Sequence, residues 1–165
     1  MKSSRFRAVS ETALSARQIV SQSFPLDRRN TRYVYPSKIE STPTGYACTT
    51  VTKIPGERYR THHVRVKMPK DYRGKFKACP EVKIDCDCGR YTFVWNYALW
   101  IADAAIRDRT NHKAPVITNP GLNTGCCKHC LVVLQGLVTV NPEWPPRSRA
   151  RPGVGVRSLK QALGK

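Results

Sequence analysis

The fold of this 165-residue chain depends on two runs, CDCGRYTFVWNYALW at residues 86–100 and CCKHCLVVLQGLV at residues 126–138. They contain two close pairs of metal-binding residue types, with one residue inside each pair: Cys86, Cys88, Cys127 and His129. Thiolates and imidazoles are the ligands that zinc prefers, and structural zinc sites hold four of them in a tetrahedron. The two pairs therefore predict a single zinc ion that organises the middle of the chain.

The cysteines that flank the second pair, Cys126 and Cys130, can each replace a ligand, so this choice stays open. The alternative to a metal site is a set of buried free thiols beside a hydrogen-bonded histidine. Five cysteines and a histidine in two tight clusters favour the metal. Four protein ligands leave no position for water, which favours a structural ion over a catalytic one. Gly89 is expected to let the backbone bend around the ion.

The order CxC, spacer, CxH resembles the SWIM zinc finger, over residues 81–138. This resemblance implies that the zinc ligands are Cys86, Cys88, Cys127 and His129, and SWIM modules are linked to DNA and protein binding. The same runs, with APVITNPGLNTG before the second, are similar to SWIM-type segments in virion proteins of large tailed bacteriophages. That similarity implies a small, non-enzymatic structural protein of the particle.

The net charge of +18 is distributed unevenly along the chain. Residues 1–77 carry 17 Lys and Arg against 5 Asp and Glu, residues 78–140 carry 6 against 5, and residues 141–165 carry 6 against 1. The nearly neutral segment holds six of the seven cysteines, so we expect it to be the structural centre and the flanks to contact DNA or protein partners. The basic residues expected to make these contacts are Arg28, Arg29, Arg58, Arg60, Arg65, Lys67, Arg147, Arg149 and Arg151.

The first twenty residues lack the apolar core of a signal peptide, and no run approaches the roughly 20 apolar residues of a membrane span. We therefore expect synthesis in the cytoplasm, where thiols stay reduced, then incorporation into a virion, with no membrane partner. The odd number of cysteines also favours metal binding over disulfides. Inside a particle, cross-links are expected from some of the remaining thiols, which are Cys48, Cys79, Cys126 and Cys130.

The expected fold class is α+β, with a small zinc-stabilised module of a β-hairpin and helices, a further β-hairpin, and extended basic arms. The expected segments are a basic N-terminal arm with a short helix (1–45), a basic β-hairpin region (46–80), a SWIM-like zinc module (81–140) and a basic C-terminal tail (141–165). The expected helices are 8–24, 97–108 and 126–138. The expected strands are 32–35, 46–53, 58–68, 81–86 and 90–97, with a linker over 25–45 and a disordered tail from residue 142.

Other residues give weaker signals. His62 and His63 are expected to be one packed and one exposed strand residue, and the tryptophans 95 and 100 are expected in the core rather than stacked on bases. Asp85 and Asp87 are expected to contact the metal ligands or to face solvent. No phosphate-binding glycine loop, pair of acid/base carboxylates or triad-like set is present, so the chain is expected not to be an enzyme. The alternative to a virion protein is a SWIM-type nucleic-acid-binding protein acting in regulation, repair or DNA compaction.

Overall fold

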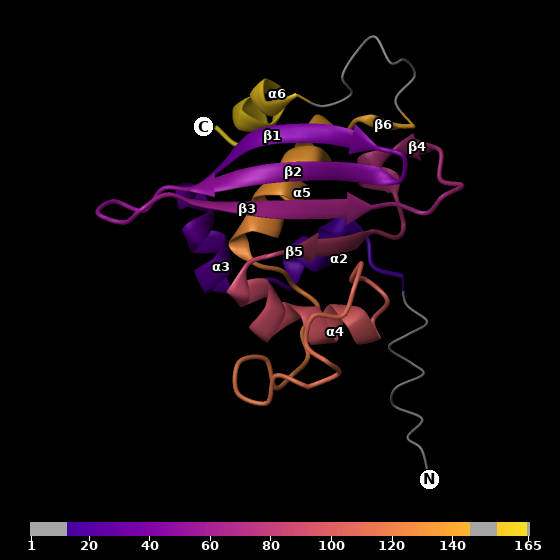
Figure 1. Ribbon diagram of the computed structural model, residues 1–165. Coiled ribbons are helices and arrows are strands. Elements are labelled where there is room, and N and C mark those ends of the chain that lie inside the picture. Colours follow the sequence, from indigo (N-terminus) through magenta and orange to yellow (C-terminus); the bar gives the residue numbers. More distant parts are fainter. Residues whose placement is uncertain (1–12, 146–154, 165) are drawn as a thin grey trace.

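The computed structural model describes residues 13–145 and 155–164, and it combines helices with a sheet, as the expected α+β class requires. Four antiparallel strands lie in the order β1-β2-β3-β5 (Figure 1). Their bounds are Val34–Thr42 for β1, Gly45–Thr52 for β2, Arg60–Lys67 for β3 and Lys83–Cys86 for β5. The expected segments 1–45, 46–80 and 81–140 thus each contribute to one sheet.

The β2–β3 hairpin follows the sequence pattern closely. Val64 and Val66 of β3 are buried, whereas the alternate residues Arg65 and Lys67 are exposed. A strand with one buried face alternates in this way because successive side chains point to opposite faces. The sequence therefore identified both the hairpin and the face of β3 that enters the core.

The expectation of a linker over residues 25–45 is wrong. Residues Pro25–Asn30 form helix α3, and β1 pairs with β2 from Val34↔Thr52 to Thr42↔Gly45, with a register shift between Pro36 and Lys38. The polar run with its proline resembles a linker, but proline and charged residues are tolerated on an edge strand. Strand β1 is such an edge, so the sequence alone underestimated its length.

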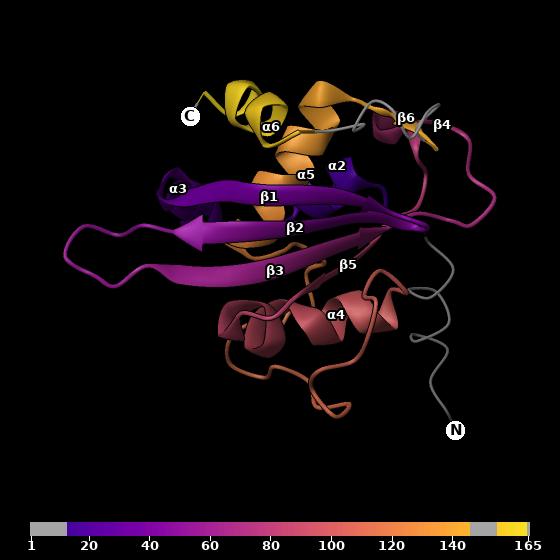
Figure 2. The same ribbon diagram turned by 45° about the horizontal axis from the view of Figure 1, so that its top comes forward.

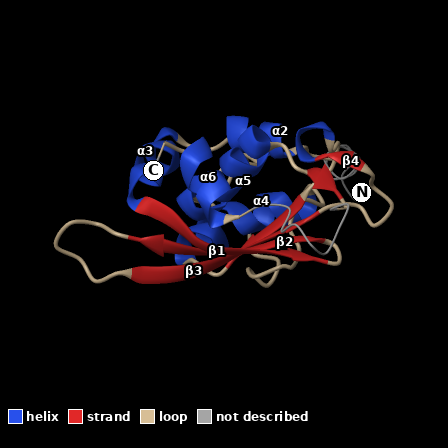
Figure 3. Cartoon of the chain, turned by 90° about the horizontal axis from the view of Figure 1, so that it is seen from above, coloured by secondary structure: helices blue, strands red, loops and turns tan. Residues whose placement is uncertain are grey.

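The helices lie together on one side of the sheet (Figure 3). Helix α5, Lys128–Val140, is central, and eight of its 13 residues are buried. The short helix α2, Ala16–Ser21, packs against α5. Figures 1 and 2 place α4, Asn96–Ile101, near β5 and place α6, Val156–Ala162, near β1, at opposite edges of the sheet. The core therefore lies between the sheet and α5.

The expected second hairpin does not form. Strand β5 pairs with β3, and the residues that follow it are helical, with a π-helical turn Tyr91–Trp95 that continues into α4. Tyr91, Val94 and Ala98 are all buried, a spacing of three and four residues that belongs to a helix rather than a strand. The aromatic and β-branched residues of this run raise its strand propensity, but packing on one helical face outweighs that preference.

The two ends of the described chain also differ from extended arms. Ile19 of α2 and Val34 of β1 are fully buried, so the N-terminal part from residue 13 belongs to the core. At the other end, β6 (Glu143–Trp144) pairs with β4 (Gly74–Lys75), and α6 buries Leu159. The rest of the expected arms, at 1–12 and 146–154, lies outside the described residues, as does the start of the expected helix 8–24.

Within the described ranges, no helix has both the length and the apolar character needed to cross a membrane.

Candidate metal centre

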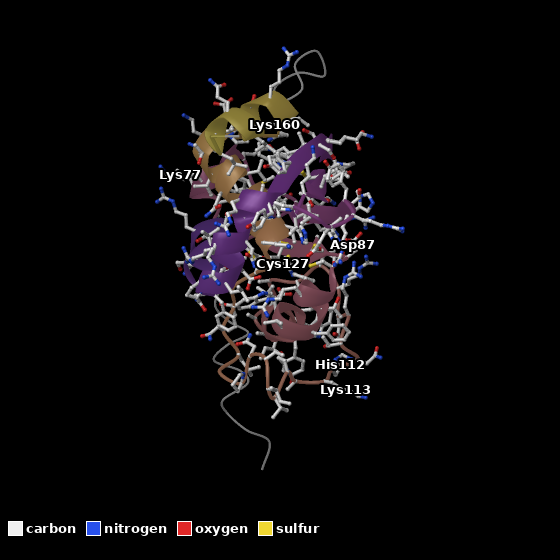
Figure 4. The ribbon with its side chains drawn as sticks, turned by 90° about the vertical axis from the view of Figure 1, so that its left-hand side faces the viewer. Lys77, Asp87, His112, Lys113, Cys127 and Lys160 are labelled. Atoms are coloured by element: carbon white, nitrogen blue, oxygen red, sulfur yellow. The ribbon has the colours of Figure 1, made fainter. Side chains whose placement is uncertain are left out.

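The two predicted ligand pairs come together in the interior. The ligand atoms of the four residues all lie within 4.8 Å of one another, and all four residues are buried: Cys86, Cys88, Cys127 and His129. Figure 4 shows Cys127 towards the middle of the molecule. The alternates Cys126 and Cys130 are not members of this group. A buried cluster of three cysteines and one histidine is compatible with one metal ion.

Each pair is held by the end of a regular element. Cys86 is the last residue of β5, opposite Val64 of β3, and Cys88 follows in the turn before the π-helical segment. Cys127 is the N-cap of α5, and His129 lies in the first turn of that helix. The free amides of a helix N-terminus stabilise nearby negative charge, so this position favours thiolates. The cluster therefore joins the edge of the sheet to the start of the central helix.

The spacing of the ligand atoms suits a tetrahedral ion. The His129 Nδ1 atom lies 3.9 Å from the Sγ atoms of both Cys86 and Cys127. Zinc bound to sulfur and nitrogen at its usual bond lengths gives a separation of roughly 3.6 Å between such ligand atoms. The widest spacing in the group, up to 4.8 Å, exceeds this separation by about 1 Å, so a bound ion would draw the ligand atoms closer together.

The second ring nitrogen of His129, Nε2, is hydrogen-bonded to a hydroxyl group. Its Nε2 atom lies 2.9 Å from the Thr52 Oγ1 atom on β2, and both residues are buried. If Nδ1 binds a metal, Nε2 carries the proton and donates it to Thr52. Such a hydrogen bond fixes the orientation and tautomer of a metal-binding histidine. No sequence pattern points to Thr52, which is 77 residues away from His129.

A histidine–aspartate pair extends from the cluster to the surface. The ring of His62 lies 4.3 Å from the ring of His129, and its Nδ1 atom lies 3.0 Å from the Asp87 Oδ1 atom. The same carboxylate oxygen accepts a hydrogen bond from the His63 backbone amide. Burial and the neighbouring His129 lower the pKa of His62, despite the opposing effect of Asp87. His62 is thus the packed member of the pair and His63 the exposed one, as predicted.

Asp85 has a different role from the one expected. Its buried carboxylate accepts hydrogen bonds from Arg107 and from Arg109, at 2.6 to 3.1 Å, rather than from a metal ligand. Burial alone would raise the pKa of Asp85, but the Arg109 and Arg107 guanidinium groups hold it below its ordinary value. Asp85 therefore anchors the loop after α4 to strand β5.

The thiols of the cluster are crowded. The Cys127 thiol and burial raise the pKa of Cys88, although Cys86 and the Tyr91 amide act in the opposite direction. Burial and the neighbouring cysteines raise the pKa of Cys130 well above its ordinary value. The raised pKa of Cys88 favours its protonated form when no cation is bound, and a divalent cation would displace that proton.

All seven cysteines are buried as free thiols. Cys48 and Cys79 are 3% and 1% exposed, and Cys126 and Cys130 are fully buried. A thiol in such a position cannot reach another chain while the fold is intact, so the structure contradicts the expected cross-links through these residues. Cys126 instead packs against Ser23, whose hydroxyl accepts a hydrogen bond from the Cys126 amide at 2.9 Å.

A glycine that the sequence did not single out positions the second ligand pair. A Cβ atom on Gly125 would lie 2.5 Å from the Ser23 Cα atom, so only glycine lets this loop approach the end of α2. Gly89, by contrast, has an ordinary backbone conformation, and its Cβ would meet only the Phe93 ring at 3.7 Å. The expectation that Gly89 is needed for a bend around the ion is therefore wrong.

The predicted basic contact residues are spread over the molecule. Arg65 and Lys67 share the exposed face of β3. Arg60 lies on the opposite face of this strand, and it forms an ion pair with Glu57 at 3.5 Å. Arg28 donates hydrogen bonds to three backbone carbonyls near the end of α2. Arg29 and Arg58 are exposed. The predicted residues Arg147, Arg149 and Arg151 lie outside the described residues.

The two tryptophans expected in the core differ in burial. Trp95 is fully buried and its ring packs 4.4 Å from that of Phe24, as expected for a core residue. Trp100 is 38% exposed, so it belongs only partly to the core.

Comparisons of this chain with protein-family models, with curated proteins and with solved structures found no match.

Proposed function

We propose that this chain is a non-enzymatic structural protein, stabilised by one zinc ion, that joins other protein subunits in a larger assembly. The observation that carries the proposal is the buried cluster of three cysteines and one histidine at the junction of β5 and α5. Four protein ligands saturate a tetrahedral ion, so such a site stabilises a fold and leaves no position for a substrate. The resemblance of the cysteine-rich runs to virion proteins suggests a tailed-phage particle as the assembly.

The described surface offers apolar contacts for a protein neighbour. Phe93 is 71% exposed, Val116 is 78% exposed and Ile117 is 91% exposed. The Thr118 hydroxyl donates a hydrogen bond to the Phe93 carbonyl, so the loop that carries Val116 and Ile117 lies against the π-helical turn. Large exposed apolar side chains in one region are typical of interaction sites between subunits.

Nucleic-acid binding is a second candidate function, and the charge on the sheet supports it. Arg65 and Lys67 are exposed on β3, and neither has an ion-pair partner within the described part of the chain. Cations that are not neutralised inside the protein are available to phosphate groups. The two candidate functions are compatible, because a protein of a particle can contact the packaged nucleic acid.

Native mass spectrometry tests the zinc site. We expect one zinc ion per chain in the wild-type protein and none in the Cys86→Ser and His129→Ala variants. Cys79→Ser is the matched control, since its buried thiol donates to the Glu81 carbonyl outside the cluster, and it should keep the ion. Zinc retained by both ligand variants would contradict the site.

The assembly role is tested on protein isolated from its native source. We expect the chain to co-sediment with a larger particle and to be released when Ile117→Ser and Val116→Ser are combined. A matched double variant on the helical side, Lys77→Ser with Lys160→Ser, should remain bound. If the wild-type chain is recovered only as a free monomer, the proposed assembly role is wrong.

A further inference from the structure

The sheet has one face that no described helix covers. Figure 3 shows the helices gathered behind the sheet, and Figure 1 shows β1, β2 and β3 in front of them. The cross-strand pairs Lys38↔Thr49 and Thr49↔His63 place side chains from all three strands on this uncovered face. We name it the open face, and its central residues are Tyr35, Lys38, Glu40, Ala47, Thr49, Val51, His63, Arg65 and Lys67.

The open face is shaped as a trough. Its middle strand, β2, presents the short side chains of Ala47 and Thr49, while the flanking strands present longer ones. A hollow of about 250 Å³ lies here, lined on its two sides by Lys38 from β1 and by His63 and Arg65 from β3. A narrow extended polymer can lie along such a trough.

The charge of the trough is positive. Glu40 is already paired with Lys38 at 2.9 Å, whereas Arg65 and Lys67 have no carboxylate partner among the described residues. At the β5 edge, Arg107 and Arg109 share the single carboxylate of Asp85, which leaves one positive charge in excess. The face is therefore complementary to a polyanion.

Aromatic rings lie at one end of the trough, beside the β2–β3 loop. The Lys53 Nζ atom lies 5.5 Å from the centre of the Tyr35 ring and 5.1 Å from that of the Tyr59 ring. Tyr59 is 70% exposed, so most of its aromatic ring is accessible to a ligand. Exposed aromatic rings next to cations are the features that bind unstacked bases in single-stranded nucleic acids.

We propose that the open face binds single-stranded nucleic acid, with phosphates on Arg65 and Lys67 and a base stacked on Tyr59. This proposal rests on the second candidate function above. A duplex is disfavoured because its bases are already stacked and cannot reach Tyr59. An acidic protein segment would use the same cations but gains little from an exposed tyrosine ring.

Fluorescence anisotropy with a labelled single-stranded oligonucleotide of about 12 nucleotides tests the proposal on the full chain. Arg65→Gln combined with Lys67→Gln should weaken binding and reduce the slope of log K against log salt by roughly 1.4, the value for two phosphates of a single strand. The matched control is Lys77→Gln combined with Lys160→Gln, which removes the same charge from residues outside the open face (Figure 4) and should leave most of the affinity.

Tyrosine 59 provides an independent measurement. Tyr59→Ala should weaken binding of the single strand by about tenfold, whereas Tyr59→Phe, which keeps the ring, should bind like the wild type. A duplex of the same sequence should bind more weakly than the single strand and should be insensitive to Tyr59→Ala. Circular dichroism of each variant checks that the fold is kept.

The outcomes separate the possible failures. No binding of any oligonucleotide by the wild type at low salt would overturn nucleic-acid binding as a function. Binding that both double variants weaken equally would overturn the assignment to the open face alone, since total charge would then explain it. Equal binding of a poly-glutamate peptide, with the same dependence on Arg65 and Lys67, would replace the nucleic acid by an acidic protein partner.

Discussion

The Thr52 hydroxyl is expected to influence the candidate metal centre, because it lies 2.9 Å from the His129 Nε2 atom. Replacing Thr52 by valine keeps the shape of the side chain but removes this partner. We expect zinc affinity to fall by about 10- to 100-fold, the usual effect of losing such a contact. Competition with a chromophoric chelator measures it. Thr52→Ser keeps the hydroxyl and should retain near wild-type affinity, and equal affinity in all three proteins would contradict this role.

Asp85 links the stability of the fold to pH. Its pKa is held below the ordinary value of 3.8 in the folded protein, so the carboxylate favours folding above about pH 4. That contribution disappears as the pH falls through the lowered folded pKa. Asp85→Asn should therefore cost about 2 kcal/mol at pH 7, and the difference from wild type should shrink near pH 3. Urea unfolding at both pH values measures it, with the exposed Asp71→Asn as the control.

At the scale of an element, the loop before α5 is fixed by its contact with α2. Gly125→Ala would place a methyl group 2.5 Å from a backbone atom of Ser23, so the loop and the N-terminus of α5 must shift. We expect a loss of about 1–3 kcal/mol in the free energy of unfolding, together with weaker zinc binding. Gly89→Ala has room for its methyl group and should be neutral or slightly stabilising. Similar thermal denaturation curves for both variants would contradict this difference.

Helix α6 packs against α5 and β1, and Leu159 is its one fully buried residue. Leu159 is fully buried, and its Cδ2 atom would lie 2.6 Å from a Cβ on Gly136, so α5 and α6 approach each other closely there. Leu159→Ala should lower the free energy of unfolding by about 2–4 kcal/mol because it removes buried methyl groups and leaves a cavity. Gln161→Ala, on the exposed side of the same helix, should change it little. Chemical denaturation would show both effects, and a neutral Leu159→Ala would mean that α6 does not stabilise the fold.

At the scale of the whole molecule, the proposed zinc ion would compete with a proton for the Cys88 thiol. The Cys127 thiol and burial raise the pKa of Cys88, so protons oppose metal binding at neutral pH. The increase in melting temperature caused by a fixed free zinc concentration should therefore be larger at pH 8 than at pH 6. Differential scanning calorimetry in metal-buffered solutions measures this increase, and His129→Ala should abolish it. An increase that does not depend on pH would argue against thiolate ligands.

Much of the candidate site could be read from the sequence because its ligands occur as close pairs. The spacing of Cys86 to Cys88 and of Cys127 to His129 is local, and only a short list of functions uses such pairs. The β2–β3 hairpin was also visible, because its alternation of buried and exposed residues is a local pattern with period two. Local periodicity and ligand type are properties that a sequence carries without its fold.

Other features depended on contacts between distant residues, and only the tertiary structure decided them. The run after Cys88 has the composition of a strand, yet it is helical because Tyr91, Val94 and Ala98 are buried together on one face. Thr52 and Gly125 act through partners in other elements, so their own surroundings in the sequence contain no signal. The open face exists because no described helix covers that side of β1, β2 and β3. The sequence by itself determined which residues can bind a metal and which strand alternates buried with exposed side chains. The packing of distant segments determined where these residues lie relative to one another, because burial depends on the whole fold.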